Sequence, residues 1–132
     1  MFKNIFGKKS DKEGTKKANG LKIDWIPLKS VEEIEEVKTA SKEGYVGVFK
    51  HSTRCSISTT VISRFEKSFP KDINLQMYYI DLLNFREVSN AIASEFNVVH
   101  QSPQLVIIKD GESVLDASHD GILQVDLREV VK

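Results

Sequence analysis

The residue of this sequence best suited to covalent chemistry is its single cysteine, Cys55. In thiol–disulfide exchange the thiolate is the nucleophile, and an unperturbed thiol is mostly protonated at neutral pH. Cys55 lies where we expect a helix to start, with Ser52 or Thr53 as the N-cap residue. The positive end of the helix dipole and the neighbouring Arg54 would both favour the ionised thiol. The plainer interpretation is a small buried cysteine without chemistry, which is what most lone cysteines are.

With one cysteine the chain cannot form an internal disulfide. Any redox chemistry at Cys55 therefore takes its second sulfur from another molecule. Metal binding is disfavoured, because one cysteine and three scattered histidines cannot build a tetrahedral site within the chain. The sequence predicts exchange with an external thiol and no metal.

Strand-like and helix-like patterns alternate along most of the chain. The apolar run 45–49 is typical of a central strand covered on both faces, and residues 50–54 indicate a polar loop that rises to the surface. Asp110-Gly111 predicts a tight hairpin, because both turn positions need positive φ. Helix caps are expected from the spacing of Ser30 with Glu33 and of Asn84 with Glu87. The expected strands are 23–27, 45–49, 75–80, 105–108 and 113–117, and the expected helices are 31–43, 57–69, 85–96 and 123–131.

The charge divides the chain into two parts, although the net charge of the 132 residues is +0. Residues 1–20 hold six lysines and two acidic residues, which leaves a net charge of −4 on residues 21–132. We expect 1–20 to be a flexible basic leader and 21–132 to be one domain. Short lysine runs can attract nucleic acid or an anionic surface, but they are more typical of solvated termini, and we expect no nucleic-acid partner. The sequence shows neither a long apolar run nor an export signal, so we expect a cytoplasmic protein without a membrane segment.

The element order predicts an α/β fold with a mixed central sheet, parallel through its βαβ units and antiparallel at the hairpin, flanked by helices on both faces. This order is similar to that of the thioredoxin-like fold. The resemblance implies that the loop holding Cys55 meets the loop holding Ser102-Pro103, with the proline in cis. A cis bond there would turn the backbone of Ser102 toward Cys55, where it could pair with an extended substrate. Gln104 could extend that contact.

Thioredoxins and glutaredoxins carry two cysteines with two residues between them at this point, whereas this chain has Cys55-Ser56-Ile57-Ser58. The position of the second thiol is therefore a serine. A hydroxyl cannot attack a disulfide at neutral pH, so an external thiol must release whatever Cys55 has captured.

More narrowly, residues 21–131 resemble the YtxJ family of monothiol bacilliredoxins. The matching motifs are Thr53-x-Cys55-x-Ile57-Ser58 after a Val-Phe-Lys-His strand end, and Val99-His100-x-Ser102-Pro103-Gln104 before the fourth strand. The resemblance implies that Cys55 removes bacillithiol from S-bacillithiolated proteins and is regenerated by a low-molecular-weight thiol. It assigns Thr53, Arg54, Ser56, Ile57, Ser58, Ser102 and Pro103 to the active site. Ser56 departs from the family, because many members have proline there.

Candidates for holding the thiol ligand are Lys50, His51, His100 and Gln104, together with Arg54 beside the thiol. Arg54 and Lys50 could meet the malate carboxylates of bacillithiol, or could be ordinary solvated charges. His51 and His100 flank the two loops and could tune Cys55, although each fits an ordinary polar loop residue better. Two other classes of protein remain open. One is a redox-inactive thioredoxin-like binding module. The other is an iron–sulfur carrier of the monothiol glutaredoxin type, whose Cys-Gly-Phe-Ser motif Ser56-Ile57 does not match.

Overall fold

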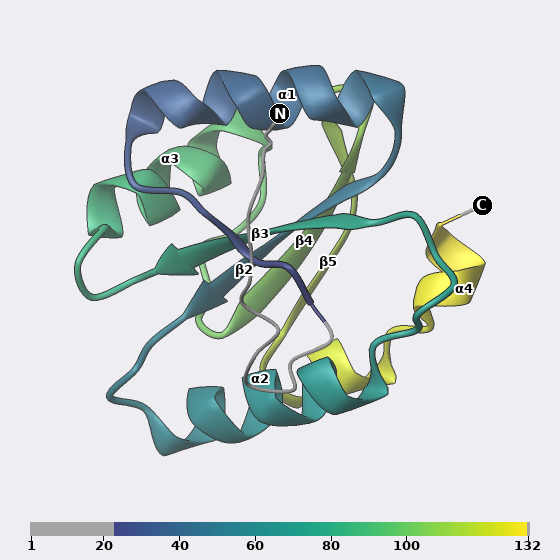
Figure 1. The fold of residues 1–132 in the computed structure, drawn as a ribbon. Coiled ribbons are helices and arrows are strands. Elements are labelled where there is room, and N and C mark those ends of the chain that lie inside the picture. The colour runs from purple at the N-terminus through teal and green to yellow at the C-terminus, as the bar shows by residue number, and fades with distance from the viewer. Residues whose placement is uncertain (1–22, 132) are drawn as a thin grey trace.

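The computed structural model of the chain describes residues 23–131 (Figure 1). Five strands alternate with helices in the order expected for an α/β protein. The strands are β1 (Ile26–Pro27), β2 (Val46–His51), β3 (Gln76–Asp81), β4 (Gln104–Lys109) and β5 (Glu112–Ser118). The α-helices are α1 (Ile34–Glu43), α2 (Ser56–Ser68), α3 (Arg86–Glu95) and α4 (Leu127–Val130), with 3-10 helices at Val31–Glu33 and His119–Gln124.

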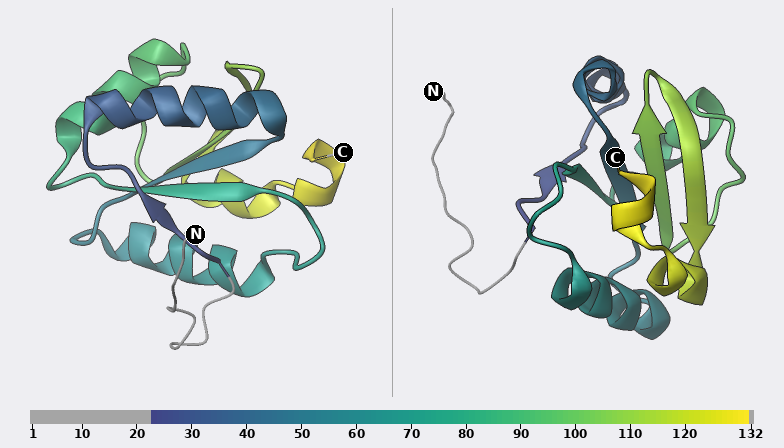
Figure 2. Two further views of the ribbon diagram at one scale, coloured as in Figure 1. Left: turned by 45° about the horizontal axis from the view of Figure 1, so that its top comes forward. Right: turned by 90° about the vertical axis from the view of Figure 1, so that its right-hand side faces the viewer.

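The strands form one mixed sheet in the order β1-β3-β2-β4-β5. β1, β3 and β2 run parallel, whereas β4 is antiparallel to β2 and β5 is antiparallel to β4. Figure 2 shows α1 and α3 over one face of this sheet and α2 with the C-terminal helices over the other. The predicted fold class is therefore confirmed.

The core is divided in two by the sheet, and the alternation of side chains along β2 decides which half each residue enters. Val46 and Val48 pack on the α1 and α3 side, whereas Phe49 packs on the α2 side against Val61 and Phe65. β2 is buried at every position because it is the central strand, paired with β3 and β4. Because of this pairing, β2 continues to His51, two residues beyond the end of the predicted strand 45–49.

Lys50 and His51 are consequently strand residues. Lys50 pairs with Ile80 on β3 and with Gln104 on β4, and His51 pairs with Asp81 on β3. Both are buried, so the prediction of a surface loop over 50–54 was wrong for its first two positions. Sheet pairing holds their backbone in place although their side chains are polar, on both sides at Lys50 and on the β3 side at His51.

The turn and cap predictions had mixed outcomes. The hairpin is confirmed, with φ of 54° at Asp110 and 78° at Gly111. The Glu33 carboxylate accepts hydrogen bonds from the backbone N–H groups of Ser30 at 3.2 Å and Lys29 at 2.7 Å, as a helix start requires. The expected cap at Asn84 was wrong, because its side chain donates to Asp81 Oδ2 at 2.8 Å and α3 begins only at Arg86.

The C-terminal helix expected over 123–131 is in fact two short pieces. A 3-10 helix ends at Gln124, Val125 is extended, and Asp126 restarts the helix by accepting a hydrogen bond from the Arg128 N–H at 3.2 Å. This break lets both Ile122 and Leu127 reach the core on the α2 side. The first expected strand, 23–27, is also shorter, since only Ile26–Pro27 pairs with β3.

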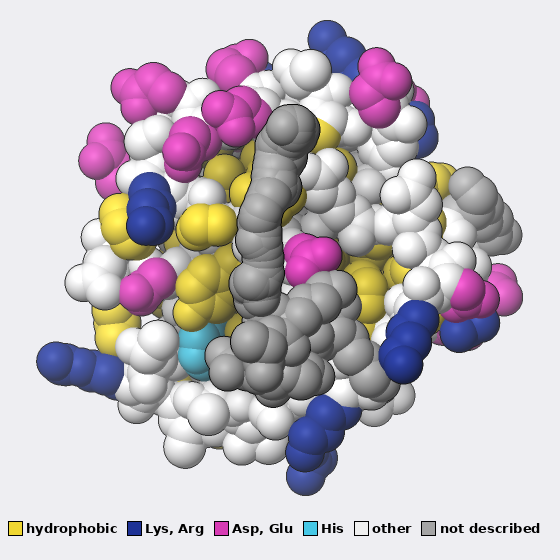
Figure 3. Space-filling view, in the orientation of Figure 1, with side chains coloured by type: hydrophobic (Ala, Val, Ile, Leu, Met, Phe, Trp, Pro, Cys, Tyr) yellow, Lys and Arg dark blue, Asp and Glu magenta, His cyan; other side chains and the backbone are white. Residues whose placement is uncertain are grey.

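The expected basic leader, 1–20, lies outside the described residues. Within residues 23–131 no helix is long and apolar enough to cross a membrane. The space-filling view shows acidic side chains gathered over the start of α1 (Figure 3), where Glu32, Glu33, Glu35 and Glu36 follow one another. Carboxylates at this position interact favourably with the N-terminal end of the helix dipole.

Candidate active site

Cys55 is the N-cap residue of α2, whereas the sequence predicted Ser52 or Thr53 in that role and Cys55 in the first turn. Its backbone is extended, with φ of −102° and ψ of 120°, and its carbonyl accepts hydrogen bonds from the Thr59 N–H at 3.0 Å and the Thr59 hydroxyl at 3.1 Å. Ser52 was expected to cap the helix, but its carbonyl accepts a hydrogen bond from the Cys55 N–H at 3.2 Å and so closes a turn ahead of the helix. The side chain of Cys55 therefore lies at the N-terminal end of α2.

The surroundings of Cys55 differ from those of a core cysteine. Its side chain is half-buried and belongs to neither core cluster. The four residues nearest to it in the chain are all exposed, and Ile57 keeps 56% of its surface accessible although it is apolar. These four are Thr53, Arg54, Ser56 and Ile57. A molecule in solution can therefore approach this end of α2.

Ser58 faces the opposite way, into the protein. It is 0% exposed, and its hydroxyl lies 2.7 Å from His51 Nδ1 and accepts a hydrogen bond from the Ser52 N–H at 3.1 Å. We call Ser52, His51 and Ser58 the hydroxyl–imidazole network. It joins the end of β2, the following loop and the first turn of α2.

This network is compatible with a neutral His51 in either tautomer. The Ser58 oxygen, which accepts from the Ser52 N–H, donates its proton to His51 Nδ1 in one tautomer and accepts a second hydrogen bond there in the other. Burial lowers the pKa of His51, although the charges of Asp81 and Glu66 act in the opposite direction. The buried imidazole is therefore favoured in its neutral form.

The second loop expected at the active site precedes β4. The peptide bond between Ser102 and Pro103 is cis, as the resemblance implied. Pro103 is buried, and its carbonyl accepts a hydrogen bond from the His119 N–H at 3.0 Å. At the start of the loop, Val99 is 73% exposed. The Ser102 hydroxyl is buried and has no hydrogen-bond partner among the described residues.

Two predicted ligand-binding residues turn out to be internal. Lys50 is 0% exposed and Gln104 is 1% exposed, so neither offers surface to a ligand in this conformation. They are cross-strand partners on the α3 side of the sheet, since β2 and β4 place Val48 and Val106 on that side two residues away. Burial alone lowers the pKa of Lys50 to about 8.

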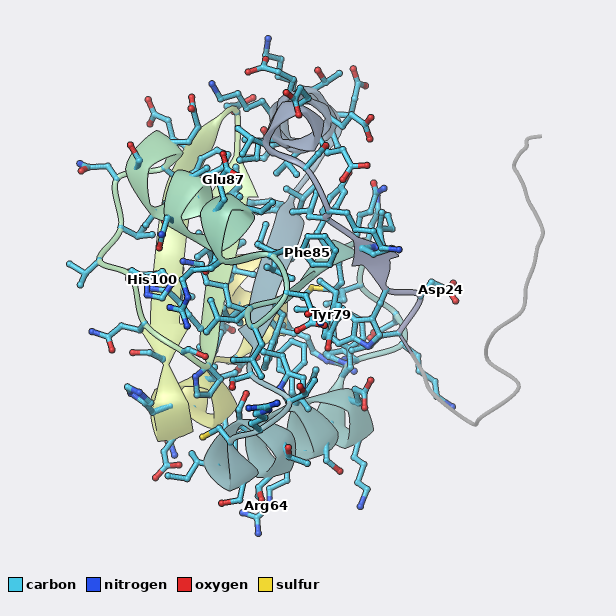
Figure 4. All side chains as sticks on the ribbon, turned by 90° about the vertical axis from the view of Figure 1, so that its left-hand side faces the viewer. Asp24, Arg64, Tyr79, Phe85, Glu87 and His100 are labelled. Carbon is cyan, nitrogen blue, oxygen red and sulfur yellow. The ribbon has the colours of Figure 1, made fainter. Side chains whose placement is uncertain are left out.

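His100 comes from the loop after α3 and lies at the left of the view in Figure 4, below that helix. Its Nε2 lies 2.9 Å from the hydroxyl of Ser89 on α3. Burial lowers the pKa of His100, and the charges of Lys50 and Arg86 lower it further. The protonation of His100 is therefore coupled to the charge of Lys50.

Sequence reasoning missed the roles of three residues at this site. Ser52 donates its N–H to Ser58, Ser89 binds His100, and Asp81, opposite His51 in the register of β2 and β3, carries a charge that acts to raise the pKa of His51. Ser89 carried a usable signal, because it is a polar residue next to Val88 on the buried stripe of a helix. Within residues 23–131 no group of three or more His, Cys, Asp or Glu residues is placed to hold a metal ion.

Comparisons with known proteins agree with this geometry. The family model described as monothiol bacilliredoxin BrxC matches residues 26–127. A solved thioredoxin-fold protein, proposed to be an oxidoreductase, is 33% identical with a TM-score of 0.65, and the match covers 81% of this chain and 91% of that chain.

Two thioredoxins show the same fold at lower identity. The thioredoxin precursor of Schistosoma mansoni is 23% identical with a TM-score of 0.60, covering 80% of this chain and 93% of that chain. The thioredoxin of Trypanosoma brucei brucei is 21% identical with a TM-score of 0.61, covering 81% and 90%.

The fold and the exposed end of α2 that carries Cys55 define a thiol oxidoreductase of the thioredoxin fold. Within that class the chain belongs to the monothiol bacilliredoxin family. Membership in this family implies that a low-molecular-weight thiol takes part in the chemistry.

Proposed function

We propose that this protein removes bacillithiol from S-bacillithiolated proteins through a mixed disulfide on Cys55. The observation that carries the proposal is the contrast between two side chains of one helix start. Cys55 is an accessible lone thiol, whereas Ser58, three residues later, is a fully buried hydroxyl held by His51. A hydroxyl at that place cannot resolve a mixed disulfide, so the cycle needs an external thiol.

The first step transfers bacillithiol to the enzyme. The Cys55 thiolate attacks the bacillithiol sulfur of the substrate's mixed disulfide, and a new S–S bond joins Cys55 to bacillithiol. The old S–S bond breaks, and the substrate cysteine leaves as a thiolate that takes a proton from water.

The second step regenerates the enzyme. The thiolate of a second bacillithiol molecule attacks the bacillithiol sulfur held by Cys55. Oxidised bacillithiol leaves with both of its thiols in one disulfide, and Cys55 returns as a thiolate. One cycle therefore consumes one protein mixed disulfide and one free bacillithiol thiol, and it releases one protein thiol and one bacillithiol disulfide.

The exposed residues around Cys55 are suited to hold the substrate. Arg54 is the exposed cation next to the thiol, and its planar guanidinium fits the carboxylates of the malate group. Thr53, Ser56 and Ile57 form the rest of that surface. We assign the backbone of Ser102 to pairing with an extended stretch of the protein substrate.

The first experiment is intact-mass spectrometry of the purified full chain after incubation with a peptide that carries a bacillithiol mixed disulfide. The same peptide carrying glutathione is run in parallel. We expect one bacillithiol on Cys55, its removal by free bacillithiol, and no adduct from the glutathione peptide. Cys55→Ser should form no adduct.

Other results would point to the other classes of protein. No adduct from either peptide would favour a redox-inactive binding module. Equal adducts from both would contradict a preference for bacillithiol. A coloured cluster after reconstitution with iron and sulfide would favour an iron–sulfur carrier.

Arg54 gives a second test of the thiol ligand. Arg54→Ala should slow transfer from the bacillithiol peptide by about threefold, since an exposed ion pair contributes little. Alkylation of Cys55 by iodoacetamide should change less, because this reagent carries no carboxylate. The measurements are the rates of peptide thiol release and of alkylation, and an equal change in both would remove the assigned role of Arg54.

A further inference from the structure

The α3 side of the sheet holds the buried amine of Lys50, which has no role in the two steps of the proposed cycle. Lys50 is 0% exposed, five residues before Cys55, and its Nζ has no hydrogen-bond partner among the described residues. A buried ammonium without a partner is costly, and an evolved protein retains one mainly where it serves the function. The question is what the amine acts on.

The cross-strand partner of Lys50, Gln104, closes the loop before β4 with a side-chain hydrogen bond. The Gln104 Nε2 donates to the Val99 carbonyl at 2.8 Å, so this side chain joins the end of the loop 99–103 to its beginning. The other end of the amide, Oε1, is buried and has no partner among the described residues. The loop so closed contains Ser102 and Pro103.

Only one of the two orientations of the Gln104 amide closes the loop. Nε2 must face the Val99 carbonyl, because two carbonyl oxygens repel each other, and Oε1 must then take the opposite side. Lys50 is the cation opposite Gln104 in the register of β2 and β4. No hydrogen bond joins Lys50 Nζ to Gln104 Oε1. The positive charge acts on the amide oxygen through space and disfavours the reversed orientation.

We propose that Lys50 is a positioning residue that holds Gln104 in its loop-closing orientation and thereby fixes the loop 99–103 for the protein substrate. This inference rests on the proposed function for its effect on transfer. Its effect on the loop itself is independent of that function. Lys50 touches neither the thiol ligand nor the reacting sulfurs in this arrangement.

The groups around Lys50 titrate away from the pH of about 8 at which Lys50 releases its proton. From β3, Ile80 lies beside it, and the pKa of Tyr78 on the same side is raised to about 12 by burial. His100 faces it from the loop with a lowered pKa, and Arg86 of α3 is a permanent cation. Asp81 lies opposite His51 in the strand register and belongs to the α2 side. The hold on Gln104 should therefore weaken as the pH rises through about 8, where Lys50 loses its proton.

The direct test is hydrogen exchange, followed by mass spectrometry, of the full-length protein and three variants. In Lys50→Met and Gln104→Met, the amides of residues 99–102 should exchange about fivefold faster than in the wild type at pH 7, the factor that a hydrogen bond of ordinary strength supplies. The double variant should be no faster than either single one, because both remove the same hold. The ratio of Lys50→Met to wild type should fall toward one at pH 9.

The functional readout separates positioning from chemistry. In both single variants the KM for the bacillithiol peptide should rise about fivefold, whereas the rate at which iodoacetamide alkylates Cys55 should stay at the wild-type value. Lys42→Met, at an exposed lysine of α1, is the matched control and should change neither.

Three results would overturn the proposal. These are unchanged exchange of residues 99–102 in Lys50→Met, additive effects in the double variant, or a parallel loss of Cys55 alkylation, which would mean that Lys50 acts on the thiol. If the wild type itself transfers no bacillithiol, the proposed function fails, while the exchange data still decide whether Lys50 holds the loop.

Discussion

Two neighbouring residues at the end of β2 show opposite ways of burying a polar group. His51 points to the α2 side and is paired with Ser58, whose hydroxyl is itself paired with the Ser52 N–H. Lys50 points to the α3 side, where its amine and the Gln104 carbonyl oxygen both lack partners among the described residues. The α2 side is a completed network, and the α3 side is an incomplete pair.

The difference bears on what each side contributes. A buried group with its hydrogen bonds made stabilises the fold and specifies one conformation. A buried charge without a partner costs stability. The network on the α2 side therefore stabilises the start of the helix that carries Cys55. On the α3 side, the buried charge of Lys50 lowers the stability of the fold and positions the loop 99–103. Three predictions test this comparison.

The largest effect on stability is expected for Ser58→Ala. It leaves the Ser52 N–H and the His51 ring without their buried partner, so the free energy of unfolding should fall by about 2 to 3 kcal/mol. Transfer of bacillithiol should largely persist while the variant is folded, because Ser58 has no sulfur chemistry to lose. Urea denaturation and the intact-mass assay measure the two effects.

Cys55→Ser is the matched variant, with the opposite pattern. It should abolish transfer and leave the free energy of unfolding nearly unchanged, because Cys55 is half-buried and its side chain makes no cap hydrogen bond. If Ser58→Ala and Cys55→Ser lost transfer to a similar degree, Ser58 would belong to the chemistry and the comparison would fail.

The comparison also shows which parts of the site the sequence could predict. The strand and helix order, the hairpin at Asp110-Gly111 and the cis bond before Pro103 were all expected and are present. Lys50 and His51 were misplaced because polarity was weighed above strand alternation. Lys50 continues the side of Val46 and Val48, and His51 continues that of Phe49.

The pairings themselves lay beyond the sequence. The bond from Ser58 to His51 joins residues seven apart across a loop, and that from His100 to Ser89 joins residues eleven apart across a helix end. Such contacts depend on how the loops pack, and neither periodicity nor cap spacing reports on that. The same holds for the N-cap at Cys55, which the turn from Ser52 moves two or three positions beyond the predicted Thr53 or Ser52.

Lys50→Met should change stability in the opposite direction to Ser58→Ala. The pKa of Lys50 falls from 10.5 to about 8 on folding, which corresponds to about 3 kcal/mol of cost at neutral pH. Relaxation around the amine reduces this, so we expect the variant to be about 1 to 2 kcal/mol more stable at pH 7. Methionine fills a similar volume without the charge.

The pH dependence isolates the amine. Below pH 8 both folded and unfolded chains hold the Lys50 proton and the full cost is present, whereas between about 8 and 10.5 the folded chain has released it and the cost declines. The wild type should therefore approach the stability of Lys50→Met as the pH rises over this range. A difference between them that stays constant with pH would show that the amine is not buried as a cation.

The smallest effect on the free energy of unfolding is expected from His51, and it tests the hydroxyl–imidazole network on the α2 side. Because burial lowers the pKa of His51 in the folded state, the unfolded chain binds the proton more readily. Stability from the neutral, hydrogen-bonded ring is thus fully present above 6.5 and is lost as the pH falls through the folded-state pKa. His51→Gln should flatten the fall in unfolding free energy between pH 7 and pH 5, measured by urea denaturation at each pH.

His119→Gln, at an exposed histidine, is the control. Equal flattening in both variants would mean that the imidazole on the α2 side is not held neutral by its burial, and the two sides of β2 would then differ less than their hydrogen bonds indicate.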